Sequence, residues 1–189
     1  TSSAASDVYK RQSYELVNRQ TCSKFNASKQ QLLRMVEIER KFLVTSDSFK
    51  RQASLTHQIV QGYLSTDPGR SVRVRIQGEK AYLTIKGAAV KHSFSRFEWE
   101  KEIALEDAEA LMSLCFPRTI QKTRHCVEFS GHLFEVDVFE GENTGLTVAE
   151  IELKNELEDF EKPKWLGKEI TGIRKYYNAQ LSQKPFAEW

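Results

Sequence analysis

The fold of this chain is decided by the stretch Val36-Glu37-Ile38-Glu39-Arg40-Lys41-Phe42-Leu43-Val44. It is rich in β-branched and aromatic residues and alternates with a period of two, a pattern that predicts a β-strand. Because successive side chains point to opposite faces of a strand, Glu37, Glu39 and Lys41 share one face. Two carboxylates on one strand face repel each other unless a cation lies between them. The strand therefore indicates either a site for a divalent cation or an acidic face in water.

Seven further stretches carry strand-like patterns. They cover residues 56–64, 71–77, 80–86, 94–103, 118–129, 132–139 and 146–153. Turn signals such as Asp67-Pro68-Gly69 and Ser130-Gly131 separate neighbouring stretches, as in hairpins. Hairpins make antiparallel sheets, and a sheet of this many strands tends to curl and close. We therefore predict a mainly β (α+β) fold: an eight-stranded antiparallel β-barrel with flanking helices.

Helices and loops account for the residues between and after these strands. The clearest helix is predicted at residues 105–114, with two acidic residues in its first turn, where the helix dipole favours them. Shorter helices are predicted at residues 156–160 and 173–181, and a small loop at residues 87–91. These helices are expected to cover the apolar faces of the sheet.

Composition sets limits on the partners. The chain has 28 Lys and Arg against 26 Asp and Glu, but residues 1–34 hold six of the basic and two of the acidic residues. The remainder therefore has 22 basic and 24 acidic residues, so no nucleic-acid partner is expected. No apolar run reaches transmembrane length and no signal peptide is present, so we expect a cytoplasmic protein without a membrane partner. Three scattered cysteines make no disulfide framework, which fits a reducing compartment.

Residues 1–34 differ from the rest of the chain. They are polar and show no clean periodicity, and Met35 stands directly before the first predicted strand. We expect residues 1–34 to be a disordered leader that is not part of the native protein, and residues 35–189 to form the functional domain. A native flexible leader is the alternative.

Like-charged pairs with i,i+2 spacing recur along the predicted strands. The acidic pairs are Glu37/Glu39, Glu98/Glu100, Glu135/Asp137 and Glu150/Glu152, and the basic pairs are Arg73/Arg75 and Lys122/Arg124, joined by Lys41 and Lys86. A face that is merely solvated would mix the signs, because like neighbours cost free energy. The opposite faces are apolar and must be covered, so the charged faces should point into the barrel.

An enclosed space lined by both signs needs counter-ions of both signs. A metal-bound chain of phosphates supplies them, because Arg and Lys bind phosphate while Mg²⁺ prefers carboxylate and phosphate oxygens. The charge pattern therefore indicates a metal and polyphosphate site. A structural ladder of salt bridges is the alternative that the residues alone leave open.

The ordered set of motifs resembles the CYTH superfamily, the triphosphate tunnel metalloenzymes, over residues 35–181. The motifs are Glu37-Ile38-Glu39-Arg40-Lys41, Gln61-Gly62-Tyr63-Leu64, Arg73-Val74-Arg75, Leu83-Thr84-Ile85-Lys86, Glu98-Trp99-Glu100, Lys122-Thr123-Arg124, Glu135-Val136-Asp137, Glu150-Ile151-Glu152, Trp165-Leu166-Gly167-Lys168-Glu169 and Tyr176-Tyr177-Asn178. The first motif alone is weakly specific, but the whole set is highly specific. Its short form is most similar to the bacterial inorganic triphosphatases.

This resemblance implies an eight-stranded tunnel that binds a triphosphate with Mg²⁺ or Mn²⁺, and it implies a role for each charged side chain. Metal ligands would be Glu37, Glu39, Asp137, Glu150 and Glu152. Phosphate ligands would be Lys41, Arg73, Arg75, Lys86, Lys122 and Arg124. Glu37, Glu39, Lys41 and Lys86 would be catalytic, and Glu98, Glu100 and Glu135 would line the tunnel and orient the basic residues.

The implied activity is metal-dependent hydrolysis of inorganic tripolyphosphate to pyrophosphate and phosphate. The partner would be a small-molecule triphosphate, and the protein a monomer or homodimer. Alternatives are other triphosphate chemistry in the same tunnel (a class IV adenylate cyclase, a thiamine triphosphatase or a nucleoside triphosphatase) or a non-catalytic polyphosphate-binding module. An RNA-end triphosphatase is disfavoured by the near-neutral charge of residues 35–189.

Overall fold

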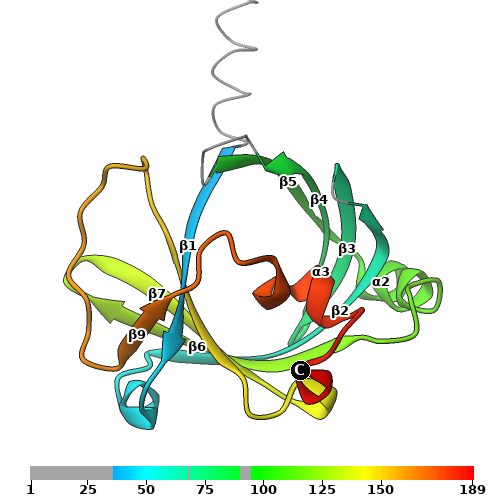
Figure 1. The fold of residues 1–189 in the computed structure, drawn as a ribbon. Coiled ribbons are helices and arrows are strands. Elements are labelled where there is room, and N and C mark those ends of the chain that lie inside the picture. Colours follow the sequence, from blue (N-terminus) through cyan, green and yellow to red (C-terminus); the bar gives the residue numbers. More distant parts are fainter. Residues whose placement is uncertain (1–35, 68, 90–94) are drawn as a thin grey trace, which may run out of the picture. The chain divides into compact units, whose positions relative to one another are not determined.

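Nine antiparallel strands form one sheet in the described part of the chain. They are β1 (Val36–Val44), β2 (Leu55–Asp67), β3 (Arg70–Gln77), β4 (Lys80–Ala89), β5 (Ser95–Ile103), β6 (Ile120–Phe129), β7 (His132–Phe139), β8 (Thr147–Glu152) and β9 (Leu166–Glu169). Their order is β5-β4-β3-β2-β6-β7-β8-β1-β9, and a further pairing joins β5 to β1. The first eight strands of this order therefore close into a barrel, seen as a ring in Figure 1. The predicted eight-stranded antiparallel barrel is confirmed, and β9 adds a short strand to β1.

The computed structural model describes residues 36–67, 69–89 and 95–189. Residues 37–189 form one compact unit, which holds the barrel. The first strand, β1, begins one residue earlier, at Val36. Our expectation for residues 1–34 lies outside the described residues. No helix in the described part of the chain is long and apolar enough to cross a membrane.

The helices are short and lie between or after the strands. They are η1 (Asp47–Arg51), α2 (Leu105–Met112), η2 (Gly141–Asn143), η3 (Arg174–Tyr176), α3 (Asn178–Leu181) and η4 (Phe186–Glu188). The helix predicted at residues 105–114 is confirmed as α2, ending two residues early. Residues 156–160 form no helix, since this acidic stretch is too short to be helical without packing support.

Two other predicted elements differ in the structure. The helix expected at residues 173–181 is interrupted at Tyr177, which is extended at φ −76° and ψ 138°, so η3 and α3 are separate. Of the loop expected at residues 87–91, the described residues 87–89 continue β4. The strand β9 was not predicted, because its four residues, Leu-Gly-Lys-Glu, are too few to show a period.

The strand register fixes which side chains share a face, because residues directly opposite each other point the same way. Glu39 lies opposite Glu152, and Lys41 lies opposite Glu150. Glu150 in turn lies opposite Glu135 on β7. In the remaining strand pairs, too, the residues of one face lie opposite residues of the same face. The like-charged pairs therefore all lie on one face of the closed sheet. This face is the inside of the barrel.

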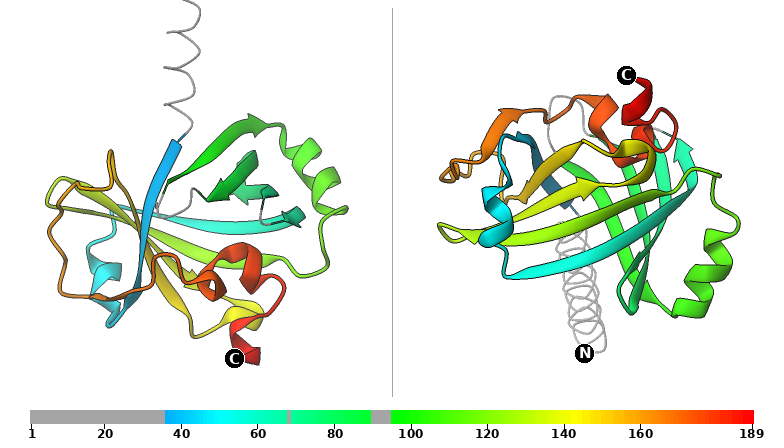
Figure 2. Two further views of the ribbon diagram at one scale, coloured as in Figure 1. Left: turned by 45° about the horizontal axis from the view of Figure 1, so that its top comes forward. Right: turned by 90° about the horizontal axis from the view of Figure 1, so that it is seen from below.

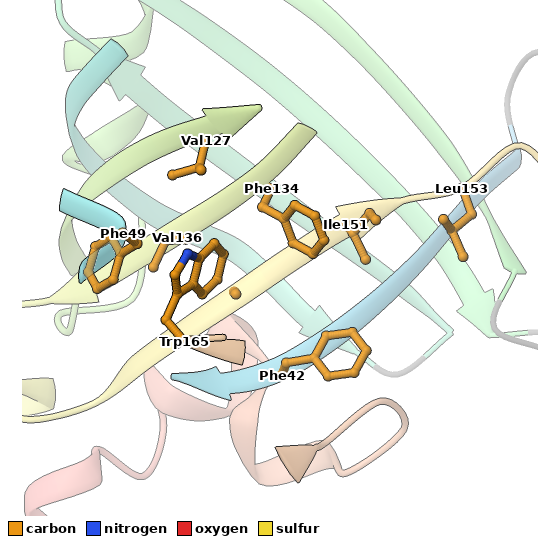
Figure 3. Packing of buried hydrophobic residues seen from close by; sticks show 9 residues of the cluster. Phe42, Phe49, Val127, Phe134, Val136, Ile151, Leu153 and Trp165 are labelled. Atoms are coloured by element: carbon orange, nitrogen blue, oxygen red, sulfur yellow. The ribbon is translucent and has the colours of Figure 1, made fainter. Parts of the chain in front are cut away.

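The outer face is apolar and is covered on two sides. The larger apolar cluster lies on the outer face of β1, β6, β7 and β8 and is drawn in Figure 3. It consists of Phe42, Phe49, Val127, Phe134, Val136, Ala149, Ile151, Leu153 and Trp165. The indole nitrogen of Trp165 donates to Gln52 Oε1 at 3.0 Å, which ties the segment before β9 to η1. On the other side α2 lies outside β3 and β4 (Figures 1 and 2), where Ala108 packs against Val74 and Ala81.

A third apolar cluster, the end cluster, includes side chains from the inner face. It consists of Ile120, Phe139, Leu146, Val148, Ile170 and Leu181. Leu181 belongs to α3, so the C-terminal segment packs against one end of the barrel interior, as the red segment in Figure 1 shows. The inside of the barrel is therefore apolar near the C-terminal segment and charged elsewhere.

Candidate active site

Four carboxylates gather where β1 pairs with β8. Glu37 and Glu39 come from β1, and Glu150 and Glu152 come from β8, with Glu39 directly opposite Glu152. Burial, and after it the charge of Glu150, raises the pKa of Glu39. All four belong to the predicted metal ligands, and the structure places them on the inner faces of two paired strands.

Lys41 lies between two of these carboxylates. Its ammonium group donates to Glu39 Oε1 at 2.8 Å and also to Glu150 Oε1. Burial alone would lower the pKa of Lys41, but the carboxylates of Glu150 and Glu39 outweigh it and raise the pKa. The ring of Tyr177, from the C-terminal segment, has its centroid 5.8 Å from Lys41 Nζ. Lys41 therefore joins the acidic wall to the end of the barrel that the C-terminal segment covers.

Glu152 differs from the other three carboxylates in its partners. Among the described residues it makes no ion pair, and its pKa is raised by burial and then by the charges of Glu37, Glu98 and Glu39. Glu152 is thus surrounded by like charges, and a cation bound beside it would offset that repulsion.

The basic wall opposite is built on β3 and β4. Arg73 Nη2 donates to Thr84 Oγ1 at 3.1 Å and to Glu100 Oε2 at 3.3 Å, and Arg75 Nη2 donates to Glu100 Oε1 at 2.9 Å. Glu100, predicted to orient basic residues, thus holds both guanidinium groups from β5. The Nε atoms of both arginines are buried and have no partner within the described chain. Buried donors without acceptors are prepared for an anion.

Lys86 connects the two walls. Its ammonium group donates to both carboxylate oxygens of Glu37, at 2.9 and 2.8 Å, and lies 2.8 Å from Glu98 Oε2. Because β5 separates β4 from β1 in the sheet, the contact with Glu37 passes over the inner face of a neighbouring strand. This is direct evidence that the charged faces converge inside the barrel.

Lys122 and Arg124 converge on Asp137. Arg124 binds the Asp137 carboxylate with Nε and Nη2, both at 2.7 Å, and Lys122 Nζ donates to the same carboxylate. Arg124 also donates to Glu135 and to Glu150. Burial, then the charge of Arg124, lowers the pKa of Lys122 to about 8. Arg124 and Lys122 outweigh the burial of Asp137 and lower its pKa.

The predicted metal ligands fit a hard divalent cation in chemistry but not yet in arrangement. Every candidate donor is a carboxylate oxygen, the donor that Mg²⁺ and Mn²⁺ prefer. Yet no three acidic, His or Cys side chains of the described residues are already grouped as a ligand set. The reason is visible in the ion pairs: Lys41, Lys86 and Arg124 each hold one or more of these carboxylates. Asp137 is the extreme case, because Lys122 and Arg124 engage both of its oxygens.

Sequence reasoning missed Arg96. Its Nε donates to Glu37 Oε2 at 2.8 Å, and its Nη2 lies 3.4 Å from Glu39 Oε2. Arg96 stands two residues before Glu98 and therefore on the inner face of β5. The spacing could have identified it, but its charge is opposite to that of its i+2 neighbour, so a search for like-charged pairs passed over it.

Gln61 and Tyr63 of β2 belong to one of the motifs that resemble the family, but the resemblance implied no role for either side chain. Gln61 is fully buried, its Nε2 donates to the Tyr63 hydroxyl at 3.2 Å, and its Oε1 has no partner among the described residues. Gly62 between them faces outward, and a Cβ there would lie 2.7 Å from Met112 Sδ and 2.8 Å from Cys115. A glycine is therefore needed for α2 to close on β2 while Gln61 and Tyr63 face the interior.

Sequence comparison finds relatives over most of the chain. The model of the CYTH domain family matches residues 35–183. An inorganic triphosphatase from Acetivibrio thermocellus is 44% identical over 153 residues, which cover 79% of this chain and 95% of the relative. An inorganic triphosphatase from Nitrosomonas europaea is 35% identical over 153 residues, covering 78% of this chain and 97% of the relative.

Structure comparison agrees. The crystal structure of the inorganic triphosphatase NE1496 is similar with a TM-score of 0.56 and 33% identity, covering 77% of this chain and 93% of that one. The PH1012 protein from Pyrococcus horikoshii has a similar fold, with a TM-score of 0.50 at 23% identity over 62% of this chain and 77% of that one. The family match spans well over half of the chain, and the two triphosphatases match nearly their whole length, so this chain belongs to the CYTH domain family.

Proposed function

We propose that this protein hydrolyses inorganic tripolyphosphate to pyrophosphate and phosphate inside the barrel, with Mg²⁺ or Mn²⁺ as cofactor. One observation carries the proposal. The inner face of a closed sheet presents carboxylates on β1 and β8 and cations on β3, β4 and β6, and Lys86 and Arg124 pair with Glu37 and Glu150 of the acidic wall. The relatives named inorganic triphosphatase support tripolyphosphate as the substrate.

The interior cations would hold the triphosphate. Arg73 and Arg75 bring guanidinium groups with unpaired Nε donors, and a guanidinium can bind a phosphate through two parallel hydrogen bonds. Lys41, Lys86, Lys122 and Arg124 add charge along the same interior. Glu98, Glu100 and Glu135 would keep these basic side chains in position, as their present ion pairs suggest.

The metal would be held by Glu37, Glu39, Glu150 and Glu152. Asp137 would join them once the triphosphate draws Lys122 and Arg124 away from its carboxylate. Bound there, a divalent cation would neutralise the phosphate charge and favour attack by water. The substrate thus does two things at once: it takes over the cations and so frees the carboxylates.

The protein's own groups then position the reaction. A water oxygen forms a bond to the terminal phosphorus, the bond from that phosphorus to the bridging oxygen breaks, and pyrophosphate leaves with the electron pair. Glu37 and Glu39 would orient the water and accept its hydrogen bonds, and one of these carboxylates would take up the proton that the water loses and pass it to solvent. Lys41 and Lys86, the cations nearest to these carboxylates, would stabilise the charge that develops on the phosphoryl oxygens.

A product assay tests this function. The protein is incubated with Mg²⁺ or Mn²⁺ and, separately, with tripolyphosphate, ATP or thiamine triphosphate, and phosphate, pyrophosphate and cyclic AMP are measured. We expect metal-dependent release of phosphate and pyrophosphate from tripolyphosphate. Release of cyclic AMP from ATP, or turnover of an organic triphosphate alone, would assign a different chemistry to the interior.

Two variants sharpen the assay. Glu39→Gln keeps the shape of the side chain but removes a charge from the acidic wall, so metal-dependent turnover should fall by at least about a hundredfold. Asp47→Asn is the matched control, because Asp47 pairs with Lys50 on the surface, away from the interior. Full activity of Glu39→Gln would refute the metal assignment, and no turnover of tripolyphosphate by the unmodified protein would refute the function.

A further inference from the structure

Arg96 is the interior cation that lies nearest to solvent. Its side chain is 25% exposed, whereas the side chains of Arg73, Arg75, Lys86 and Arg124 are 7–14% exposed. It comes from β5, the strand that closes the barrel on β1. A charged group at this position can exchange its partner with little rearrangement of the packed core.

The partners of Arg96 are the two carboxylates of β1. It donates to Glu37 at 2.8 Å, while its contact with Glu39 is long, at 3.4 Å. Each of these carboxylates also has a lysine, since Lys86 holds Glu37 and Lys41 holds Glu39. Both carboxylates would therefore keep a cationic partner without Arg96. Ion pairing within the protein alone does not explain why an arginine lies at this position.

The same guanidinium is close to the phosphate-binding cations. Arg96 Nε and Lys86 Nζ both donate to the same oxygen, Glu37 Oε2, each at 2.8 Å. Arg96 thus shares a carboxylate with a cation that we assign to the phosphates. A triphosphate that reaches Lys86 would offer Arg96 phosphate oxygens in place of that carboxylate.

We propose that Arg96 is a further substrate-binding residue, which holds Glu37 and Glu39 in the metal-free protein and passes to the triphosphate when a divalent cation takes those carboxylates. The inference rests on the proposed function. Arg96 competes with the metal and cooperates with the substrate, so its removal has effects of opposite sign on the two. By thermodynamic linkage, a metal that displaces Arg96 also strengthens the binding of triphosphate.

Binding measurements separate these effects. Mn²⁺ alone is titrated into the full chain and into Arg96→Gln by calorimetry. The non-hydrolysable imido analogue of tripolyphosphate, used as its stand-in, is then titrated in the presence of saturating Mn²⁺. We expect Arg96→Gln to bind Mn²⁺ alone at least about fivefold more tightly and to bind tripolyphosphate at least about fivefold more weakly. Arg96→Lys should recover most of the tripolyphosphate affinity, because it restores the charge.

Arg40→Gln is the matched control. Arg40 also binds a carboxylate of a neighbouring strand, Glu169, through Nε and Nη2 at 2.8 and 2.6 Å, but on the outside of the barrel. The Arg40→Gln substitution should leave the affinities for Mn²⁺ and for tripolyphosphate unchanged. The proposal is overturned if Arg96→Gln binds Mn²⁺ no more tightly than the unmodified protein, or if its tripolyphosphate affinity is unchanged. The Mn²⁺ titration needs no turnover, so it tests Arg96 even where the hydrolysis assay fails.

Discussion

At the scale of single residues, the interior is a set of charges that neutralise one another in pairs. The pairs were predictable in part: the like-charged spacing identified the acidic and basic members, and the structure brings them onto one face. The spacing in the sequence does not show which cation pairs with which carboxylate. Lys86 reaches Glu37 across an intervening strand, and that contact depends on the closure of the sheet. Arg96 was missed for another reason, because its charge is opposite to that of Glu98, two residues further along β5.

Asp137 is the residue whose removal should cost most stability. It is fully buried, and its carboxylate holds the buried side chains of Lys122 and Arg124. Asp137→Asn should lower the free energy of unfolding of the metal-free protein by about 3–5 kcal/mol, because it removes the carboxylate that pairs with buried Lys122 and one of the three that pair with Arg124. Urea unfolding followed by circular dichroism measures the change. Asp47→Asn, at an exposed ion pair, should change it by less than about 1 kcal/mol. An equal effect of the two variants would contradict this account.

Glu152 should behave in the opposite way. Its pKa is raised by burial and then by neighbouring carboxylates, so its charge opposes folding at neutral pH. Glu152→Gln should therefore keep or raise the melting temperature of the metal-free protein, while the rate of metal-dependent hydrolysis falls by at least about tenfold. Thermal melts and product assays on one preparation give both quantities. A lower melting temperature together with full activity would show that Glu152 has a structural role instead.

At the scale of elements, the ion pair between Arg40 and Glu169 joins β1 to β9 on the outside of the barrel. The hydrogen bond from Arg40, and after it the hydrogen bond from Thr171, keeps the pKa of Glu169 below its usual range despite partial burial. A carboxyl whose pKa is depressed in the folded state stabilises the protein above its unfolded pKa, near 4.5. That contribution is lost as the pH falls through the folded value.

Glu169→Gln tests this sign. The melting temperature of the unmodified protein should exceed that of Glu169→Gln at pH 7, and the difference should shrink as the pH falls below about 4.5. Melting curves between pH 3 and pH 7 measure it, with Asp47→Asn as a surface control. A difference that grows towards low pH would show that Glu169 does not act through its charge.

Long strands were predictable from sequence, and the smallest elements were not. The alternation that identified β7 at residues 132–139 extends over eight residues, enough for a period to show. By contrast, η3 and α3 have three and four residues. Such short helices depend on the surface beneath them, here the end cluster that contains Leu181, and a local sequence pattern does not report that surface.

At the scale of the whole molecule, metal and substrate should bind cooperatively. The carboxylates are held by the cations that we assign to the phosphates, so each ligand alone must break ion pairs that the other would release. We expect the rise in melting temperature with Mg²⁺ and tripolyphosphate together to exceed the sum of the rises with each alone. Thermal melts at fixed ligand concentrations measure this, with sulfate in place of tripolyphosphate as the anion control. Simple addition of the two rises would mean that the ion pairs are not exchanged on binding.

The pairing of β5 with β1 has a consequence for contacts between molecules. A sheet that closes on itself has few strand edges with unpaired backbone groups, and such edges are where proteins add strands from other chains and aggregate. Within the described residues, the outer edge at the end of the sheet belongs to β9, which is four residues long. The interior can thus collect strongly opposed charges while the backbone around it offers another chain very little to pair with.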